Sequence, residues 1–393
     1  MNANSRDDSA PGFDTLAVHA GREDLTGLGL HALPIDLSTT NPLPDIETGG
    51  DSYETLAGGG RPVEGGSNVY ARLWNPTVAR FESGLARLEH AETAVAFASG
   101  MAALSAAILA YAGATSMRHV VAVRPLYGGT DHILATGLLG TEVSFCEPDE
   151  VAASIREDTG LVIMETPANP TLELVSIRAV VDQAAEVPVL VDNTFATPVL
   201  QNPIDHGAAL VMHSATKYLG GHGDVVGGVI ACSEQHAQRL RPIRAITGGI
   251  LHPLAAYLLH RGLATLPLRV RAQQATAQRL AEWLRGHDAV AEVFYPGEHS
   301  DPQGVLGTQM RGTGAMLSIR LRGGLEAAER LTSTVGIFTH AVSLGGVDSL
   351  IEHPAALTHR PVAGDARPDA GIVRMSIGLE NAEDLIADLA RGL

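Results

Sequence analysis

Short apolar runs alternate with longer amphipathic stretches along the chain from Pro76 onward. Pro76 suits the first turn of a helix, and Phe81, Leu85 and Leu88 recur at the spacing of one helix face. The apolar runs after it have strand length and are separated by stretches of helical length, which predicts an α/β fold with a mostly parallel sheet wrapped by helices. These runs are residues 94–98, 119–123, 142–146, 161–165, 187–191, 210–213 and 225–230.

The segment before this region has no such pattern. Residues 20–68 show little periodicity and are rich in Gly, Pro and Thr. A long irregular segment in a compact protein is typical of a functional segment or of one that reaches a neighbour. We therefore expect residues 1–73 to form a separate N-terminal arm with one of these two roles.

The last third of the chain mixes helical and extended patterns. A long helical region is predicted at 253–285, and a last helix is predicted from Asn381. This mixture indicates a smaller α+β domain at 263–393, after a large domain at 74–262. The shorter segments between the two helical regions are 314–321, 325–333 and 372–377.

Composition and charge narrow the class of function. The net charge of −17 argues against nucleic acid or an anionic membrane surface as the main partner. The two cysteines, Cys146 and Cys232, cannot form a disulfide framework and fit a reducing cytoplasm. No apolar run is long enough to span a bilayer. Residues 1–11 are polar, which predicts a disordered tail rather than a secretory signal.

Lys217 is the only lysine among the 27 basic residues, and arginine fills every other position. Arginine is always protonated, whereas an amine can lose its proton when it is desolvated and can then form a Schiff base. A drift of composition toward arginine is the ordinary alternative. The hydroxyls and glycines around Lys217, from His213 to Asp224, favour a catalytic amine instead.

Polar residues follow several of the predicted strands, where open α/β sheets bind their ligands. Residues 99–101 open an Ala-rich helix whose free N–H groups suit a phosphate. Tyr127 can stack on a flat ring, and Asp192 ends an apolar strand and needs a partner such as a pyridinium nitrogen. Each also has an ordinary reading, as an N-cap, a packed loop aromatic or a backbone-bonded Asp. Together with Lys217 they are the parts that a pyridoxal phosphate (PLP) site requires.

From about Leu37 to the C-terminus, the chain resembles the Cys/Met-metabolism PLP-dependent enzymes, the trans-sulfuration enzymes. This family includes cystathionine γ-synthase, cystathionine γ-lyase and methionine γ-lyase, and the resemblance implies the PLP-dependent transferase fold of type I. The segments that carry it are Tyr70-Ala71-Arg72, Asn75-Pro76-Thr77, Ser99-Gly100-Met101, Glu165-Thr166-Pro167-Ala168-Asn169-Pro170, Val191-Asp192-Asn193-Thr194, Ser214-Ala215-Thr216-Lys217-Tyr218 and Arg374-Met375-Ser376-Ile377-Gly378-Leu379-Glu380.

The resemblance implies a role for each matching residue. Lys217 would hold PLP covalently, and Asp192 would pair with its pyridine nitrogen. Tyr127 would stack on the ring and protonate the leaving group. The further residues implied in cofactor binding are Ser99, Gly100, Met101, Asn169, Ser214 and Thr216.

The resemblance also implies shared active sites and a way of holding the substrate. Tyr70 and Arg72 would reach the phosphate of a neighbouring subunit, in a homotetramer of dimers that share active sites. Arg374 would clamp the substrate α-carboxylate in a bidentate pair, with Asn169 and Ser343 assisting.

Val342 helps to distinguish which member of the family the chain resembles. Enzymes of the family that act on cystathionine typically carry Glu there, whereas Val is similar to the methionine γ-lyases and suits a thioether methyl. Two departures from those lyases point the other way: Gly129 stands where they carry Cys, and Arg244-Ala245 where they carry Lys-Asp. We expect a carbon–sulfur lyase that releases 2-oxobutanoate, ammonia and a thiol from L-methionine or a close homologue.

Other functions stay open at this point. The nearest are cystathionine γ-lyase, cystathionine γ-synthase and an O-acylhomoserine sulfhydrylase on the same scaffold. An aminotransferase and a PLP-binding protein without catalysis are further alternatives. The joint presence of Lys217, Tyr127, Asp192 and Arg374 disfavours the non-catalytic protein.

Overall fold

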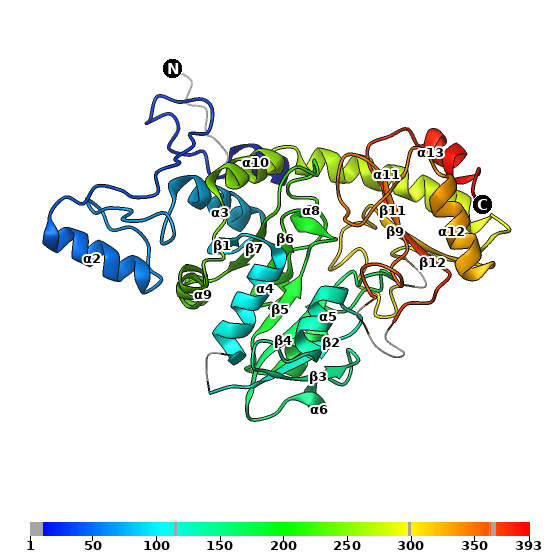
Figure 1. The fold of residues 1–393 in the computed structure, drawn as a ribbon, viewed down its shortest axis with the longest axis horizontal. Helices are drawn as coiled ribbons and strands as arrows, with labels where there is room; N and C mark the ends of the chain where they lie inside the picture. The colour runs from blue at the N-terminus through cyan, green and yellow to red at the C-terminus, as the bar shows by residue number, and fades with distance from the viewer. Residues whose placement is uncertain (1–10, 114–115, 298–299, 361, 363–366) are drawn as a thin grey trace, which may run out of the picture.

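The chain is organised around two β-sheets (Figure 1). The computed structural model describes residues 11–113, 116–297, 300–360, 362 and 367–393. Except for Pro11, the predicted tail at 1–11 therefore lies outside the described residues. A seven-stranded sheet forms the centre, and a five-stranded sheet lies toward the C-terminus.

The seven-stranded sheet has the order β1-β7-β6-β5-β4-β2-β3. Its strands from β2 to β6 run parallel, but β7 runs antiparallel to both β1 and β6. The prediction of a mostly parallel sheet is thus confirmed, with β7 as the exception. The strands are β1 (Thr93–Phe97), β2 (His119–Val123), β3 (Glu142–Cys146), β4 (Thr159–Glu165), β5 (Val189–Asp192), β6 (Leu210–Ser214) and β7 (Gly228–Cys232).

Helices cover both faces of this sheet, because most of its strands are apolar on both sides. One core cluster joins the sheet to α3 (Pro76–Leu88), α7 (Ile177–Ala184) and α10 (Pro253–Leu263). A second cluster lies under helices on the other face. These are α4 (Gly100–Ile108), its π-helical continuation η1 (Leu109–Gly113), α5 (Gly128–Ala135) and α9 (Glu234–Thr247). Short helices fill connections at α6 (Val151–Ser154), α8 (Thr197–Leu200) and η2 (Pro203–His206).

The five-stranded sheet has the order β10-β11-β12-β9-β8 and packs against three helices in a third core cluster. The predicted helical region at 253–285 is two helices, because α10 ends at Leu263 and α11 begins beside Pro267. The elements of this part are α11 (Leu266–Arg285), β8 (Val290–Phe294), β9 (Met316–Leu321), α12 (Gly324–Thr334), β10 (Thr339–His340), β11 (Leu350–Glu352), β12 (Ile372–Ser376) and α13 (Ala382–Leu389).

The segment before α3 contains α1 (Phe13–His19), α2 (Ile46–Ala57) and long stretches without regular structure. Figure 1 shows α2 standing away from the body of the molecule. Several large apolar side chains of this segment are exposed, including Ile46, which is 95% exposed, and Leu37, which is 58% exposed. The arm therefore presents apolar surface that the described chain does not cover.

Candidate active site

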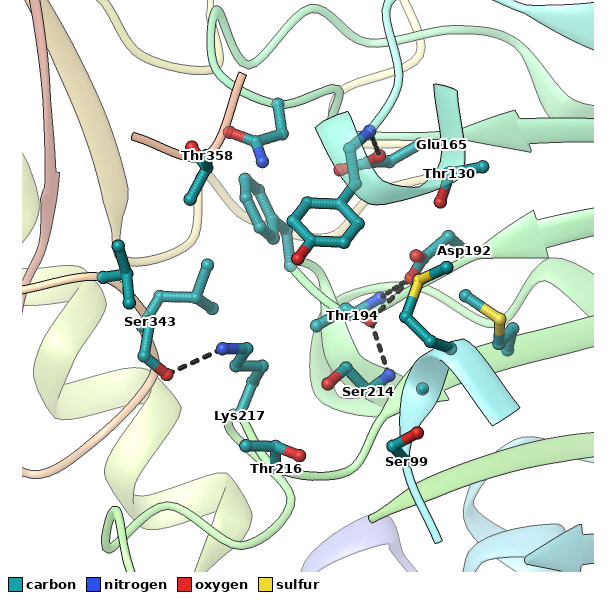
Figure 2. Close-up of a pocket in the computed structure, with 18 of the residues that line it drawn as sticks. Ser99, Thr130, Glu165, Asp192, Thr194, Ser214, Thr216, Lys217, Ser343 and Thr358 are labelled. Atoms are coloured by element: carbon teal, nitrogen blue, oxygen red, sulfur yellow. Dashed lines mark hydrogen bonds between the residues drawn. The ribbon is translucent and has the colours of Figure 1, made fainter. Parts of the chain in front are cut away.

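A cavity of about 450 Å³ lies at the carboxyl ends of the central strands. Because β1 and β6 are both antiparallel to β7, β1 ends at the same edge as β6, β5, β4 and β2. Figure 2 shows that loops from both sheets contribute side chains to the cavity. It brings together the predicted residues Ser99, Gly100, Met101, Tyr127, Asn169, Asp192, Ser214, Thr216, Lys217, Val342, Ser343 and Arg374.

The N-terminus of α4 forms one wall of the cavity. Ser99 is the N-cap, and its side chain accepts a hydrogen bond from the amide of Ala102 at 3.1 Å. The helix passes close to the end of β6, since a Cβ added at Gly100 would lie 3.1 Å from Cβ of Ser214. The positive end of the helix and the nearby hydroxyls can therefore hold a phosphate.

Lys217 and Ser343 lie on one side of the cavity (Figure 2). The amine donates a hydrogen bond to Oγ of Ser343 at 2.7 Å. Burial, and then the charge of Arg374, lower the pKa of the Lys217 amine to about 8. An amine in this environment becomes neutral far more readily than an exposed lysine. Ser343 has a φ of 95°, a conformation unusual for a residue with a side chain.

Asp192 faces the cavity from the other side, next to Thr194 (Figure 2). Its Oδ1 accepts hydrogen bonds from the amide of Thr194 at 3.0 Å and from the hydroxyl at 2.5 Å. The Thr194 hydroxyl oxygen in turn accepts from the amide of Ser214 at 2.9 Å. Burial raises the pKa of Asp192, and the Thr194 donors oppose that rise. A cation bound beside this carboxylate would be strongly favoured.

Tyr127 precedes α5, and its backbone amide donates to Oε2 of Glu165 at 2.6 Å. Burial raises the pKa of its phenol. Two glycines after Tyr127 allow close contacts that a larger residue would prevent. A Cβ at Gly128 would lie 2.1 Å from the carbonyl oxygen of Thr358, and one at Gly129 would lie 2.5 Å from Cε1 of Tyr127. The ring therefore occupies space that any side chain at position 129 would take.

Arg374 is buried and held by three groups. Its guanidinium donates to Oδ1 of Asn169 at 3.0 Å and to the carbonyl oxygen of Ser343 at 3.1 Å. It also forms an ion pair of 2.9 Å with Glu352. Glu352 was not predicted from sequence, because it meets Arg374 as its partner across β11 and β12. That pairing leaves no mark in the local sequence.

Tyr70 and Arg72 do not line the cavity of their own chain. Tyr70 is 43% exposed, and Arg72 donates to the carbonyl oxygen of Ala245 at 2.8 Å. Arg244 is also outside the cavity lining and forms a buried ion pair of 2.7 Å with Glu82. Arg244 thus joins α9 to α3 in this chain.

Comparison with known proteins decides the family. The sequence profile described as Cys/Met metabolism PLP-dependent enzyme matches residues 14–393. The chain belongs to this family. Membership of the Cys/Met-metabolism enzymes makes PLP the cofactor, and the fold predicted from the resemblance is confirmed.

The names of the matching relatives describe more than one activity. An L-methionine gamma-lyase from Brevibacterium aurantiacum is 60% identical over 97% of this chain and 94% of its own length. A cystathionine gamma synthase from Xanthomonas oryzae pv. oryzae has a TM-score of 0.88 with 34% identity, over 98% of both chains. Apo CalE6, a methionine gamma lyase from Micromonospora echinospora, has a TM-score of 0.84 with 37% identity, over 98% of this chain and 99% of its own.

Proposed function

We propose that the protein catalyses the PLP-dependent α,γ-elimination of L-methionine or a close homologue, releasing 2-oxobutanoate, ammonia and a thiol. The observation that carries this proposal is the meeting of Lys217, Asp192 and Arg374 in one cavity, with Val342 in its wall. The identity of 60% to an L-methionine gamma-lyase supports the choice of substrate.

The residues fit PLP. The N-terminus of α4, with Gly100, Met101, Ser214 and Thr216, would hold the phosphate. Asp192 would keep a proton on the ring nitrogen, because a buried carboxylate favours a neighbouring cation. When bound, PLP supplies an electron sink for the carbanion formed at the substrate Cα.

Two residues move the protons in this proposal. The Lys217 amine would remove the Cα proton of the bound substrate and then move a Cβ proton. Its pKa of about 8 lets it both accept and release a proton near neutral pH. The raised pKa of Tyr127 keeps the phenol protonated, so that it can protonate the departing sulfur.

The remaining side chains select the substrate. Arg374 binds the α-carboxylate with the help of Asn169 and Ser343, which already orient the guanidinium. Val342 is 52% exposed and offers apolar contact to a thioether methyl. It offers no anion to the distal ammonium of cystathionine.

We further propose that the protein is a homotetramer of active-site-sharing dimers, with Tyr70 and Arg72 reaching the phosphate in a second copy. Their position outside the cavity of their own chain supports this, as does the exposed apolar surface of the arm. This proposal divides the chain into an arm at 1–73, a large domain at 74–262 and a C-terminal domain at 263–393. The arm would complete the site of the second copy.

A cytoplasmic location is part of the same proposal. Cys146 and Cys232 are both buried and free, as expected in a reducing compartment. None of the helices in the described segments has the length and apolar character needed to cross a membrane.

The release of 2-oxo acid from methionine, cystathionine, homocysteine and O-acetylhomoserine, measured side by side, tests the proposed function. We expect methionine to give the highest kcat/KM. Faster release from cystathionine would support a cystathionine γ-lyase instead. Release of acetate from O-acetylhomoserine that depends on added sulfide, and that gives homocysteine in place of a 2-oxo acid, would indicate a sulfhydrylase.

A further inference from the structure

Glu165 and Asp192 are paired last residues of neighbouring parallel strands. They are register partners on β4 and β5, and both line the cavity. Paired residues on parallel strands point to the same face, and such strands lie about 4.8 Å apart. The two carboxyl groups therefore line the same cavity from neighbouring strands. Two negative charges there would repel each other, because little solvent screens them.

The surroundings of the two carboxyls differ. Asp192 accepts two hydrogen bonds from Thr194. In the proposed PLP-bound enzyme, Asp192 would additionally pair with the ring nitrogen. These groups stabilise the negative charge on Asp192 rather than on Glu165.

Glu165 is buried, and its hydrogen-bond donors are uncharged. Its carboxyl accepts hydrogen bonds from the backbone amides of Tyr127, at 2.6 Å, and of Asn169. The nearby cation is Arg374, whose guanidinium is already paired with Glu352 at 2.9 Å. The charged and titratable groups facing Glu165 are thus Asp192 on β5, Arg374 on β12 and Tyr127 before α5.

We propose that Glu165 is a positioning residue that stays a neutral carboxylic acid at neutral pH. In this state its carbonyl oxygen still accepts the amide hydrogen of Tyr127, which fixes the start of α5 and the residue above the cofactor. The negative charge of the pair then belongs to Asp192, where the ring nitrogen needs it. The inference rests on the PLP-dependent function proposed above.

The electrostatics of the buried site agree with this geometry. Burial, followed by the charge of Asp192, raises the pKa of Glu165 well above its usual range. The backbone amides of Tyr127 and Asn169 and the charge of Arg374 oppose the rise. A carboxylic acid held neutral in an apolar site can serve as a fixed hydrogen-bonding group at neutral pH.

Three forms of the PLP-bound enzyme test the inference: wild type, Glu165→Gln and Glu165→Met. Gln retains both the shape and the hydrogen-bond acceptor of a neutral acid, whereas Met has similar volume and no acceptor for Tyr127. We expect the Gln variant to lose less than about tenfold in kcat/KM and the Met variant more. The dissociation constant of PLP, measured by equilibrium dialysis, should follow the same order.

Infrared difference spectroscopy reads the proton directly and does not depend on the substrate. Wild type at neutral pH should show the carbonyl stretch of a protonated carboxylic acid, and the band should be missing from Glu165→Gln. Absence of the band in wild type would overturn the inference, even if a variant failed to fold. So would a loss of ~10²-fold or more in the Gln variant, the size expected for a catalytic charge. If methionine proves not to be the substrate, the band is still expected.

Discussion

The contribution of Lys217 to the stability of the cofactor-free protein should grow as the pH rises from about 8 to about 10.5, because its site favours the neutral form of the amine. The folded amine has a pKa of about 8, compared with 10.5 for an ordinary lysine. Between these values the amine is protonated in the unfolded chain and neutral in the folded chain, so its contribution to the free energy of unfolding rises with pH. The full difference corresponds to about 3 kcal/mol. Below pH 8 the Lys217 amine is protonated in both the folded and the unfolded protein, so this gain in stability is absent.

Urea unfolding at a series of pH values measures this effect. Wild type and Lys217→Met would be compared without cofactor, since Met keeps most of the side-chain length and lacks the charge. Groups other than Lys217 titrate equally in both proteins, so the difference between the two stability curves isolates the amine. We expect that difference to grow by about 3 kcal/mol over the window, which urea unfolding resolves.

Labelling with an amine-reactive reagent gives an independent value for the pKa of Lys217. Apart from the N-terminal amine, Lys217 is the only amine in the chain, so the modified peptide identifies it. The labelling rate should reach half its maximum near pH 8. Arg374→Met should move this midpoint upward, because it removes a nearby like charge. Parallel stability curves for wild type and Lys217→Met, or a labelling midpoint near 10.5, would refute the reasoning.

The remaining predictions concern the cofactor nitrogen, the shared site and the substrate. Asp192→Asn should lower kcat by ~10²–10⁴-fold in the 2-oxo acid assay, and near-normal turnover would contradict its role. Mixing inactive Arg72→Ala and Lys217→Ala subunits should restore part of the activity, because one pocket can combine two intact halves; no recovery after subunit exchange confirmed by mass spectrometry would exclude sharing. Val342→Glu should raise kcat/KM for cystathionine relative to methionine by pairing the distal ammonium, and a wild-type preference for cystathionine would show that the apolar-wall argument is wrong.

The placement of the cavity could be predicted because polar residues directly follow apolar strands. Asp192 follows such a run, and parallel strands bring their carboxyl ends to one edge. The direction of β7 could not be predicted, because a strand buried on both faces has the same pattern in either direction. The break between α10 and α11 was missed because both helices carry apolar periodicity up to the junction at residues 264–265.

Interactions between residues on different strands were the other features that could not be predicted from the sequence. Glu352 lies on a strand of three residues and gains its importance only from its register with Arg374. Glu165 stood within a segment that resembles the family, but its partnership with Asp192 needs the pairing of β4 with β5. Sequence patterns report which face of an element is buried, whereas they do not report which residue lies opposite.

The contacts that complete the cavity join parts of the chain that are made far apart in time. Ser343 comes 126 residues after Lys217, and Arg374 comes 205 residues after Asn169. At about 5–20 residues per second of synthesis, Ser343 leaves the ribosome roughly 6–25 seconds after Lys217. During that interval the nascent chain has its amine but neither Ser343 nor the arginine that helps to lower its pKa. Selective capture of PLP is therefore expected to follow release of the finished chain rather than to accompany its translation.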